Sequence, residues 1–128
     1  MESCFVNLIE KQDKILVIEN GYFGSRMVNI SQRLNVEIDV LHFEWGTPLV
    51  IDDLKAKLDN NKYDLVAVVH AETSTGVRNP IEKIKPHLDD KTIFIVDAVT
   101  SFGTIELNVD NWGIDAVYSC SQKGLSCP

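Results

Sequence analysis

The residues that could carry chemistry gather in four short polar segments, each of which follows an apolar run. They are Asn20-Gly21, residues 70–76 (HAETSTG), Asp97, and residues 119–123 (SCSQK). Ligands of open α/β sheets bind beyond the carboxyl ends of the strands, so residues that directly follow strands are the first candidates for a site. These four segments are therefore the candidate functional residues of the chain.

Each segment also has a purely structural interpretation. Asp97 can be an acid that faces a ligand, or it can cap the turn that follows its strand. The hydroxyl-rich HAETSTG segment can receive a phosphate or a ring hydroxyl, or it can simply form a turn. Lys123 can be a nucleophilic amine if its surroundings disfavour the ammonium form, or it can be a solvated surface charge.

Five apolar runs of strand length could position these segments. They span residues 14–18, 36–43, 64–70, 92–97 and 114–118. Continuous apolar runs, as opposed to alternating ones, are typical of strands that are buried on both faces. We therefore expect five strands in the interior of a sheet.

The segments between the runs have helical spacing. In residues 23–34 the apolar side chains recur every three or four positions, and residues 48–58 and 79–88 have the same pattern. Residues 2–10 are expected to form the last turns of a helix that begins without a cap. This alternation predicts an α/β fold, with a mostly parallel sheet and helices flanking it on both sides.

Composition excludes several classes of protein. The chain has 128 residues, a formal net charge of −7 and 45% hydrophobic residues, which predicts one soluble globular domain. Its acidic balance disfavours nucleic acid and anionic membranes as partners, and its apolar runs are far below the roughly 20 residues of a membrane span. Three cysteines without a CxxC pair predict neither a disulfide framework nor a metal site, and indicate a cytoplasmic protein.

Three motifs in fixed order give a family resemblance. ETSTGVRNP, VDAVTSFG and NVDNWGIDAVYSCSQKGL together resemble the class V pyridoxal-phosphate aminotransferases of fold type I, in particular the alanine–glyoxylate and serine–pyruvate aminotransferase group. The resemblance extends to NGYFGSRM and to Trp45-Gly46, so it covers essentially the whole chain. A dinucleotide-binding fold is excluded because the first turn, NGYFGSR, lacks GxGxxG.

The resemblance assigns a role to each candidate residue. It implies that Lys123 is catalytic, forms an aldimine with pyridoxal 5'-phosphate and moves a proton during the reaction. Asp97 would hold the protonated ring nitrogen, and Val99 would pack on one face of the ring. Thr73 and Gln122 would contact the cofactor.

The same resemblance implies a function and a domain. The expected reaction moves an amino group from alanine or serine to glyoxylate or pyruvate, in a homodimer. Residues 1–128 would be a cofactor-binding segment of the large domain, with the N-terminal arm, the phosphate loop and the C-terminal domain outside them, so the isolated segment is expected to be inactive. The alternatives are a cysteine desulfurase or lyase of the same superfamily, or an inactive binding fragment. Desulfurases usually have a histidine where this chain has Gln122, which disfavours that reaction.

Three further side chains near these motifs have open interpretations. His70 and Glu72 could form an acid/base pair, although a histidine at a strand end is more often a core or orienting residue. Cys120 stands where the family usually has glycine. It could be a redox or metal residue, and we favour a packed thiol.

Overall fold

The computed structural model describes residues 1–128 and contains an α/β fold. The helices are α1 (Glu2–Leu8), α2 (Tyr22–Gln32) and α3 (Ile51–Asp59), with two 3-10 helices, η1 (Ile81–Lys83) and η2 (Lys85–His87). The strands are β1 (Lys14–Glu19), β2 (Glu37–His42), β3 (Leu65–Val69), β4 (Ala71–Glu72), β5 (Val77–Arg78), β6 (Ile93–Asp97) and β7 (Ala116–Tyr118).

Five of these strands form one sheet in the order β2-β1-β3-β6-β7, and every neighbouring pair is parallel. The five predicted runs correspond to these five strands, so the mostly parallel sheet is confirmed. All five residues of β3, LVAVV, are buried, as expected for the central strand of a sheet that is covered on both faces.

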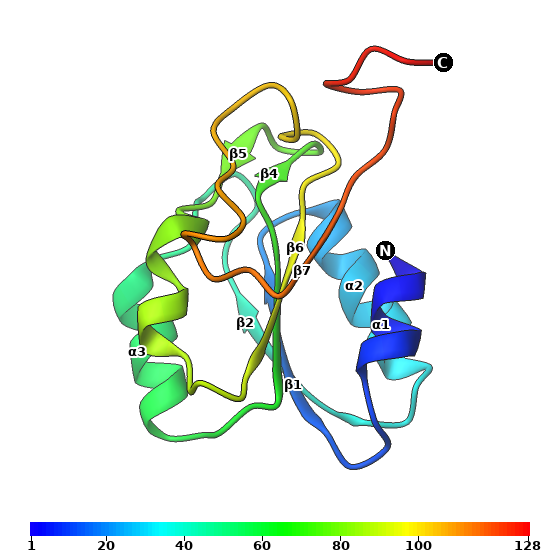
Figure 1. Cartoon of the computed structure of the whole chain (residues 1–128). Coiled ribbons are helices and arrows are strands. Elements are labelled where there is room, and N and C mark those ends of the chain that lie inside the picture. Colours follow the sequence, from blue (N-terminus) through cyan, green and yellow to red (C-terminus); the bar gives the residue numbers. More distant parts are fainter.

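Helices cover both faces of the sheet (Figure 1). On one face α1 and α2 pack through Phe5, Met27 and Ile30 onto the sheet. On the other face, α3 and the 3-10 helices pack through apolar side chains that include Leu54 and Ile81. Each face therefore has its own apolar core, and the predicted flanking helices are confirmed.

The segment 79–88 differs from the helical prediction. It forms the two short 3-10 helices η1 and η2, with Pro86 in the second. Proline lacks the backbone N–H that an α-helix needs, and its ring collides with the carbonyl four residues earlier, so a continuous helix cannot pass this point. Ile81 and Ile84 are nevertheless buried against the sheet, as the apolar spacing predicted.

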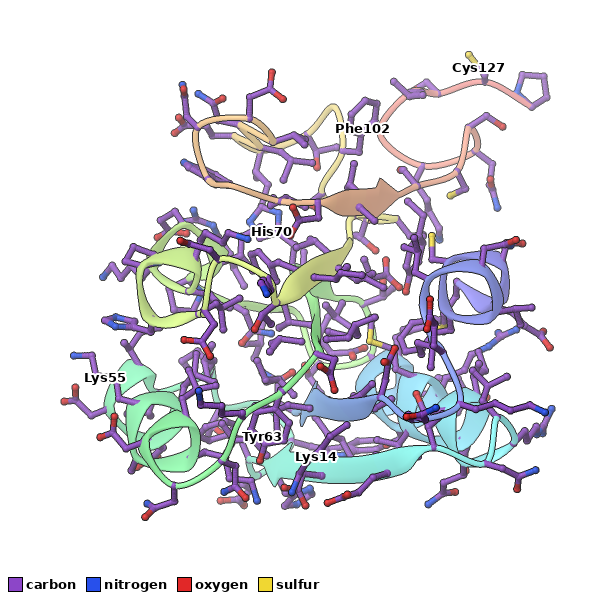
Figure 2. All side chains as sticks on the ribbon, turned by 60° about the horizontal axis from the view of Figure 1, so that its bottom comes forward. Lys14, Lys55, Tyr63, His70, Phe102 and Cys127 are labelled. Atoms are coloured by element: carbon purple, nitrogen blue, oxygen red, sulfur yellow. The ribbon has the colours of Figure 1, made fainter.

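A polar network around Tyr63 lies toward the amino-terminal ends of the strands (Figure 2). The Tyr63 hydroxyl donates to Oδ2 of Asp39 at 2.6 Å, and the Lys57 ammonium lies 3.4 Å from the same oxygen. The Tyr63 hydrogen bond is the largest of the effects that lower the pKa of Asp39 below its ordinary value. This network joins β2 to α3 and to the start of β3, away from the carboxyl ends of the strands.

The longest helix, α2, has 11 residues, so none of the helices could span a membrane. The three cysteines, Cys4, Cys120 and Cys127, are free. No three His, Cys, Asp or Glu side chains are grouped in a way that could hold a metal ion.

Candidate functional site at the carboxyl ends of the strands

Three of the predicted polar segments meet at the carboxyl ends of the strands, at the top of Figure 1. The β4–β5 hairpin contains HAETSTG, and its Thr73 hydroxyl hydrogen-bonds to the Thr100 hydroxyl in the loop that follows β6. The segment that follows β7 packs on the same loop, because Gly124 lies so close that a Cβ there would be 2.1 Å from the Phe102 carbonyl oxygen. Only glycine fits this approach.

The segment after β1 also lies at this edge, where two buried amide side chains, Asn20 and Asn79, connect it to its neighbours. Nδ2 of Asn20 donates to Oδ1 of Asn79 at 2.8 Å and to the carbonyl of Thr47 at 2.9 Å. Asn79 in turn receives the N–H of Leu49 at 2.8 Å and donates to the carbonyl of Val69 at 2.8 Å. Because these groups are buried and their hydrogen bonds are made, the network fixes the loops after β1, β2 and β3 relative to one another.

Asp97 ends β6 at the centre of this edge and is only 3% exposed. The backbone N–H of Val99 donates to its Oδ1 at 2.9 Å, so Asp97 also caps a turn. No other hydrogen bond of good geometry reaches this carboxylate, although the Tyr118 side chain is near enough to lower its pKa. Burial is the largest of the effects that raise the pKa of Asp97 above its ordinary value, so a cation that met this carboxylate would favour the charged form.

Gln122 and Lys123 lie in an exposed turn after β7. This turn is closed by two backbone hydrogen bonds, from Ser126 to the Lys123 carbonyl at 2.9 Å and from Cys127 to the Ser121 carbonyl at 3.0 Å. The Lys123 ammonium forms no ion pair in the structure. The structure thus gathers Thr73, Asp97 and Val99 at one edge, and does not bring Lys123 into contact with them.

Glu72 has a role that was not predicted from the sequence. Its carboxylate is 1% exposed and accepts from the backbone N–H groups of Phe23 and Gly24, each at 3.1 Å. Its Oε1 also accepts from the N–H and the hydroxyl of Ser74, at 3.1 and 2.8 Å. Glu72 therefore caps the N-terminus of α2 from the neighbouring loop.

The sequence contained a signal for this cap. The N-cap residue of α2 is Gly21, which has no side chain to cap the first turn, so another residue must accept the free N–H groups of the helix. Gly21 also makes room for the cap, because a Cβ there would lie 2.3 Å from Cγ of Glu72. A carboxylate at a helix N-terminus is stabilised further by the helix dipole.

The acid/base pair of His70 and Glu72 is wrong. Nε2 of His70 lies 3.4 Å from Nε of Arg78, and the imidazole packs edge-on against Trp112 with 6.1 Å between ring centroids. Burial, followed by the charge of Arg78, lowers the pKa of His70 to about 4, so the ring is neutral near pH 7. Figure 2 shows His70 in the interior, which confirms the interpretation as a core residue.

Cys120 is partly buried, and its Sγ lies 3.9 Å from the carbonyl oxygen of Val99. This contact agrees with the packed thiol that we favour from the sequence. Its contact adds to the packing between the loop after β6 and the segment that precedes Lys123.

We predict that Glu72→Gln destabilises the fold. The amide group keeps the shape of the side chain, but its nitrogen cannot accept the N–H groups that one carboxylate oxygen accepts, and leaving them buried and unpaired costs about 1–3 kcal/mol. Urea unfolding of the full-length protein measures this loss. Glu106→Gln is the matched control, because Glu106 is exposed and makes no hydrogen bond or ion pair. Equal unfolding midpoints for the two variants would contradict the capping role.

Comparison with known proteins agrees with the resemblance of the motifs. The family model described as "Aminotransferase class-V" matches residues 2–128. A Synechococcus protein named "Soluble hydrogenase, small subunit" is 39% identical over 100% of this chain and 35% of its own length. The (S)-ureidoglycine–glyoxylate transaminase of Bacillus subtilis is 36% identical over 100% of this chain and 31% of its own length.

A solved structure has the same fold. The crystal structure of an alanine–glyoxylate aminotransferase from Nostoc sp. superposes with a TM-score of 0.95 at 38% identity, over 100% of this chain and 34% of that chain. The chain therefore spans about a third of the length of these relatives. Since the family model matches nearly every residue, the chain belongs to the class-V aminotransferase family.

Proposed function

We propose that the full-length protein transfers the amino group of a small amino acid, alanine or serine, to a 2-oxo acid, with glyoxylate preferred over pyruvate as acceptor. The similar proteins from Bacillus subtilis and Nostoc sp. support this choice, because both are named as aminotransferases that use glyoxylate. Membership of the class-V family implies pyridoxal phosphate as the cofactor.

The residues at the carboxyl edge fit this cofactor, and Asp97 is the observation that carries the proposal. Its buried carboxylate accepts the N–H of Val99 and keeps unused acceptor sites, at the edge where α/β sheets bind ligands. A protonated ring nitrogen would supply both the missing hydrogen-bond donor and the missing positive charge. When bound, the cofactor would act as an electron sink for the carbon that loses its proton.

The neighbouring residues would orient the cofactor. Val99 is half-buried two residues beyond Asp97, where its apolar side chain would pack against a ring. The Thr73 hydroxyl, in contact with Thr100, would donate to the cofactor, and Gln122 would contact it from the turn after β7.

Lys123 would hold the cofactor covalently and move the proton at the reacting carbon. Its amine can do both only when neutral, and a nearby cationic ring or removal from water favours the neutral form. The exposed turn that contains Lys123 packs through Gly124 onto the loop that begins at Asp97, so the backbone of this turn lies close to that loop.

We also propose that residues 1–128 are a cofactor-binding segment of the large domain, completed by other parts of the protein. The Synechococcus and Bacillus subtilis relatives are about three times as long as the region they share with this chain, which supports a larger whole. Assembly as a homodimer and location in the cytoplasm remain predictions.

The test uses the full-length protein with pyridoxal phosphate, each of the donors alanine, serine and cysteine, and glyoxylate or pyruvate. We expect glycine to form from glyoxylate with alanine or serine, with a turnover in the usual range of about 1–1000 per second. Formation of alanine from cysteine, with sulfide released when dithiothreitol is added as reductant, would instead support the desulfurase alternative. A protein that neither binds the cofactor nor transfers an amino group would support the remaining alternative, an inactive binding fragment.

A further inference from the structure

We propose that Tyr118 is a positioning residue: its hydroxyl group donates to the carboxylate of Asp97, holds it in place and keeps it ionised. The effect of this contact on the reaction rests on the proposed function, because there Asp97 is the residue that would face the ring nitrogen. The proposed pairing itself involves only residues of this chain.

The register of the sheet places the two residues side by side. Strands β6 and β7 are parallel, and Asp97 is the partner of Tyr118 across them, as Ile95 is the partner of Ala116. Neighbouring strands lie about 4.8 Å apart, and residues two apart in a strand point to the same face. Ile95, Ala116 and Tyr118 all pack in the core beneath α1 and α2, so the Asp97 side chain points to that face as well.

The Tyr118 hydroxyl is buried beside Asp97, a carboxylate that can accept its proton in a hydrogen bond. The hydroxyl oxygen is fully buried and has no hydrogen-bond partner. A buried hydroxyl that stays unpaired is costly, and the carboxylate on the adjacent strand has unused acceptor sites, because only the N–H of Val99 donates to it. A small adjustment of the tyrosine ring would satisfy both groups.

The electrostatics of the two residues agree with this pairing. Burial, followed by the negative charge of Asp97, raises the pKa of Tyr118, so the hydroxyl keeps its proton and is a donor. The other titratable side chains that act on the pair are Glu72, which disfavours the Asp97 charge, and Arg26 and Cys4 near Tyr118. Only Tyr118 among them is the cross-strand partner of Asp97.

This contact would matter to the reaction because the pKa of Asp97 is raised by burial. A carboxyl that took up a proton would lose its attraction for a protonated ring nitrogen. A donor from Tyr118 favours the ionised form and so extends cofactor binding to lower pH.

The test is the titration of Asp97 in the cofactor-free, full-length protein labelled with carboxyl-13C aspartate. The Asp97 resonance is identified by its loss in Asp97→Asn. We expect Tyr118→Phe to raise the pKa of Asp97 by about 1, the scale of one hydrogen bond to a charged group. The pH at which half of the affinity for pyridoxal phosphate is lost should move up by the same amount.

Tyr63→Phe is the matched control. It removes the hydroxyl that donates to Asp39 at the opposite end of the sheet, so it should change the titration of Asp39 and leave that of Asp97 as it is. An unchanged Asp97 titration in Tyr118→Phe would overturn the inference. A different result would contradict the proposed function, namely that Asp97→Asn binds pyridoxal phosphate as tightly as the unsubstituted protein.

Discussion

Lys123→Ala should lower amino transfer by the full-length protein by about four orders of magnitude or more. The substitution removes the only group that we propose both attaches the cofactor and moves the proton, and loss of an acid/base group alone typically costs up to about 10⁴-fold. The measurement is glycine formation from glyoxylate at saturating pyridoxal phosphate, compared with the unsubstituted protein.

The fold should tolerate this change. Lys123 lies in an exposed turn and makes no ion pair, and substitutions at such positions usually change stability by less than about 0.5 kcal/mol. Lys62→Ala is the matched control, because Lys62 is also exposed but precedes β3 at the opposite end of the sheet. Activity of Lys123→Ala within tenfold of Lys62→Ala would contradict the catalytic role.

Asp97→Asn should slow the chemical step by about a thousandfold, which corresponds to about 4 kcal/mol of activation free energy. Asparagine keeps the shape of the side chain and still accepts the N–H of Val99, so the turn is retained. It cannot supply the negative charge that keeps the ring nitrogen protonated. Single-turnover kinetics with alanine or serine measures the step, and cofactor affinity should fall as well.

Asp39→Asn is the matched control for Asp97→Asn, because it removes the charge of a carboxylate that we assign no role in the reaction. Asp39 also accepts from a tyrosine and lies close to a lysine, but it belongs to the opposite end of the sheet. We expect this variant to be less stable and to keep its rate within about threefold of the unsubstituted protein. A decrease of less than tenfold for Asp97→Asn would leave Asp97 as a turn cap only.

Most of the fold could be predicted because its signals are local. Apolar runs such as LVAVV and IFIV specify strands buried on both faces, and apolar residues every three or four positions specify α1, α2 and α3. The segment after β5 was predicted less well, since its apolar spacing is helical while Pro86 prevents a regular helix.

The candidate site was predictable only in part. Polar residues at strand ends indicated the edge where ligands bind, and the structure places Asp97 and Thr73 there. The roles of Glu72 and Tyr118 depend on residues that are distant in the sequence, namely the first turn of α2 and the register between β6 and β7. Neither contact leaves a local pattern, so the cap made by Glu72 was not predicted from the sequence.

The attachment of the cofactor to Lys123 is tested most directly by reduction. The full-length protein is incubated with pyridoxal phosphate, treated with borohydride, digested, and its peptides are examined by mass spectrometry. We predict one phosphopyridoxyl group for each chain, on the peptide that contains Lys123, and none in Lys123→Ala. A label on another lysine, or no label at all while the protein transfers amino groups, would contradict the assignment.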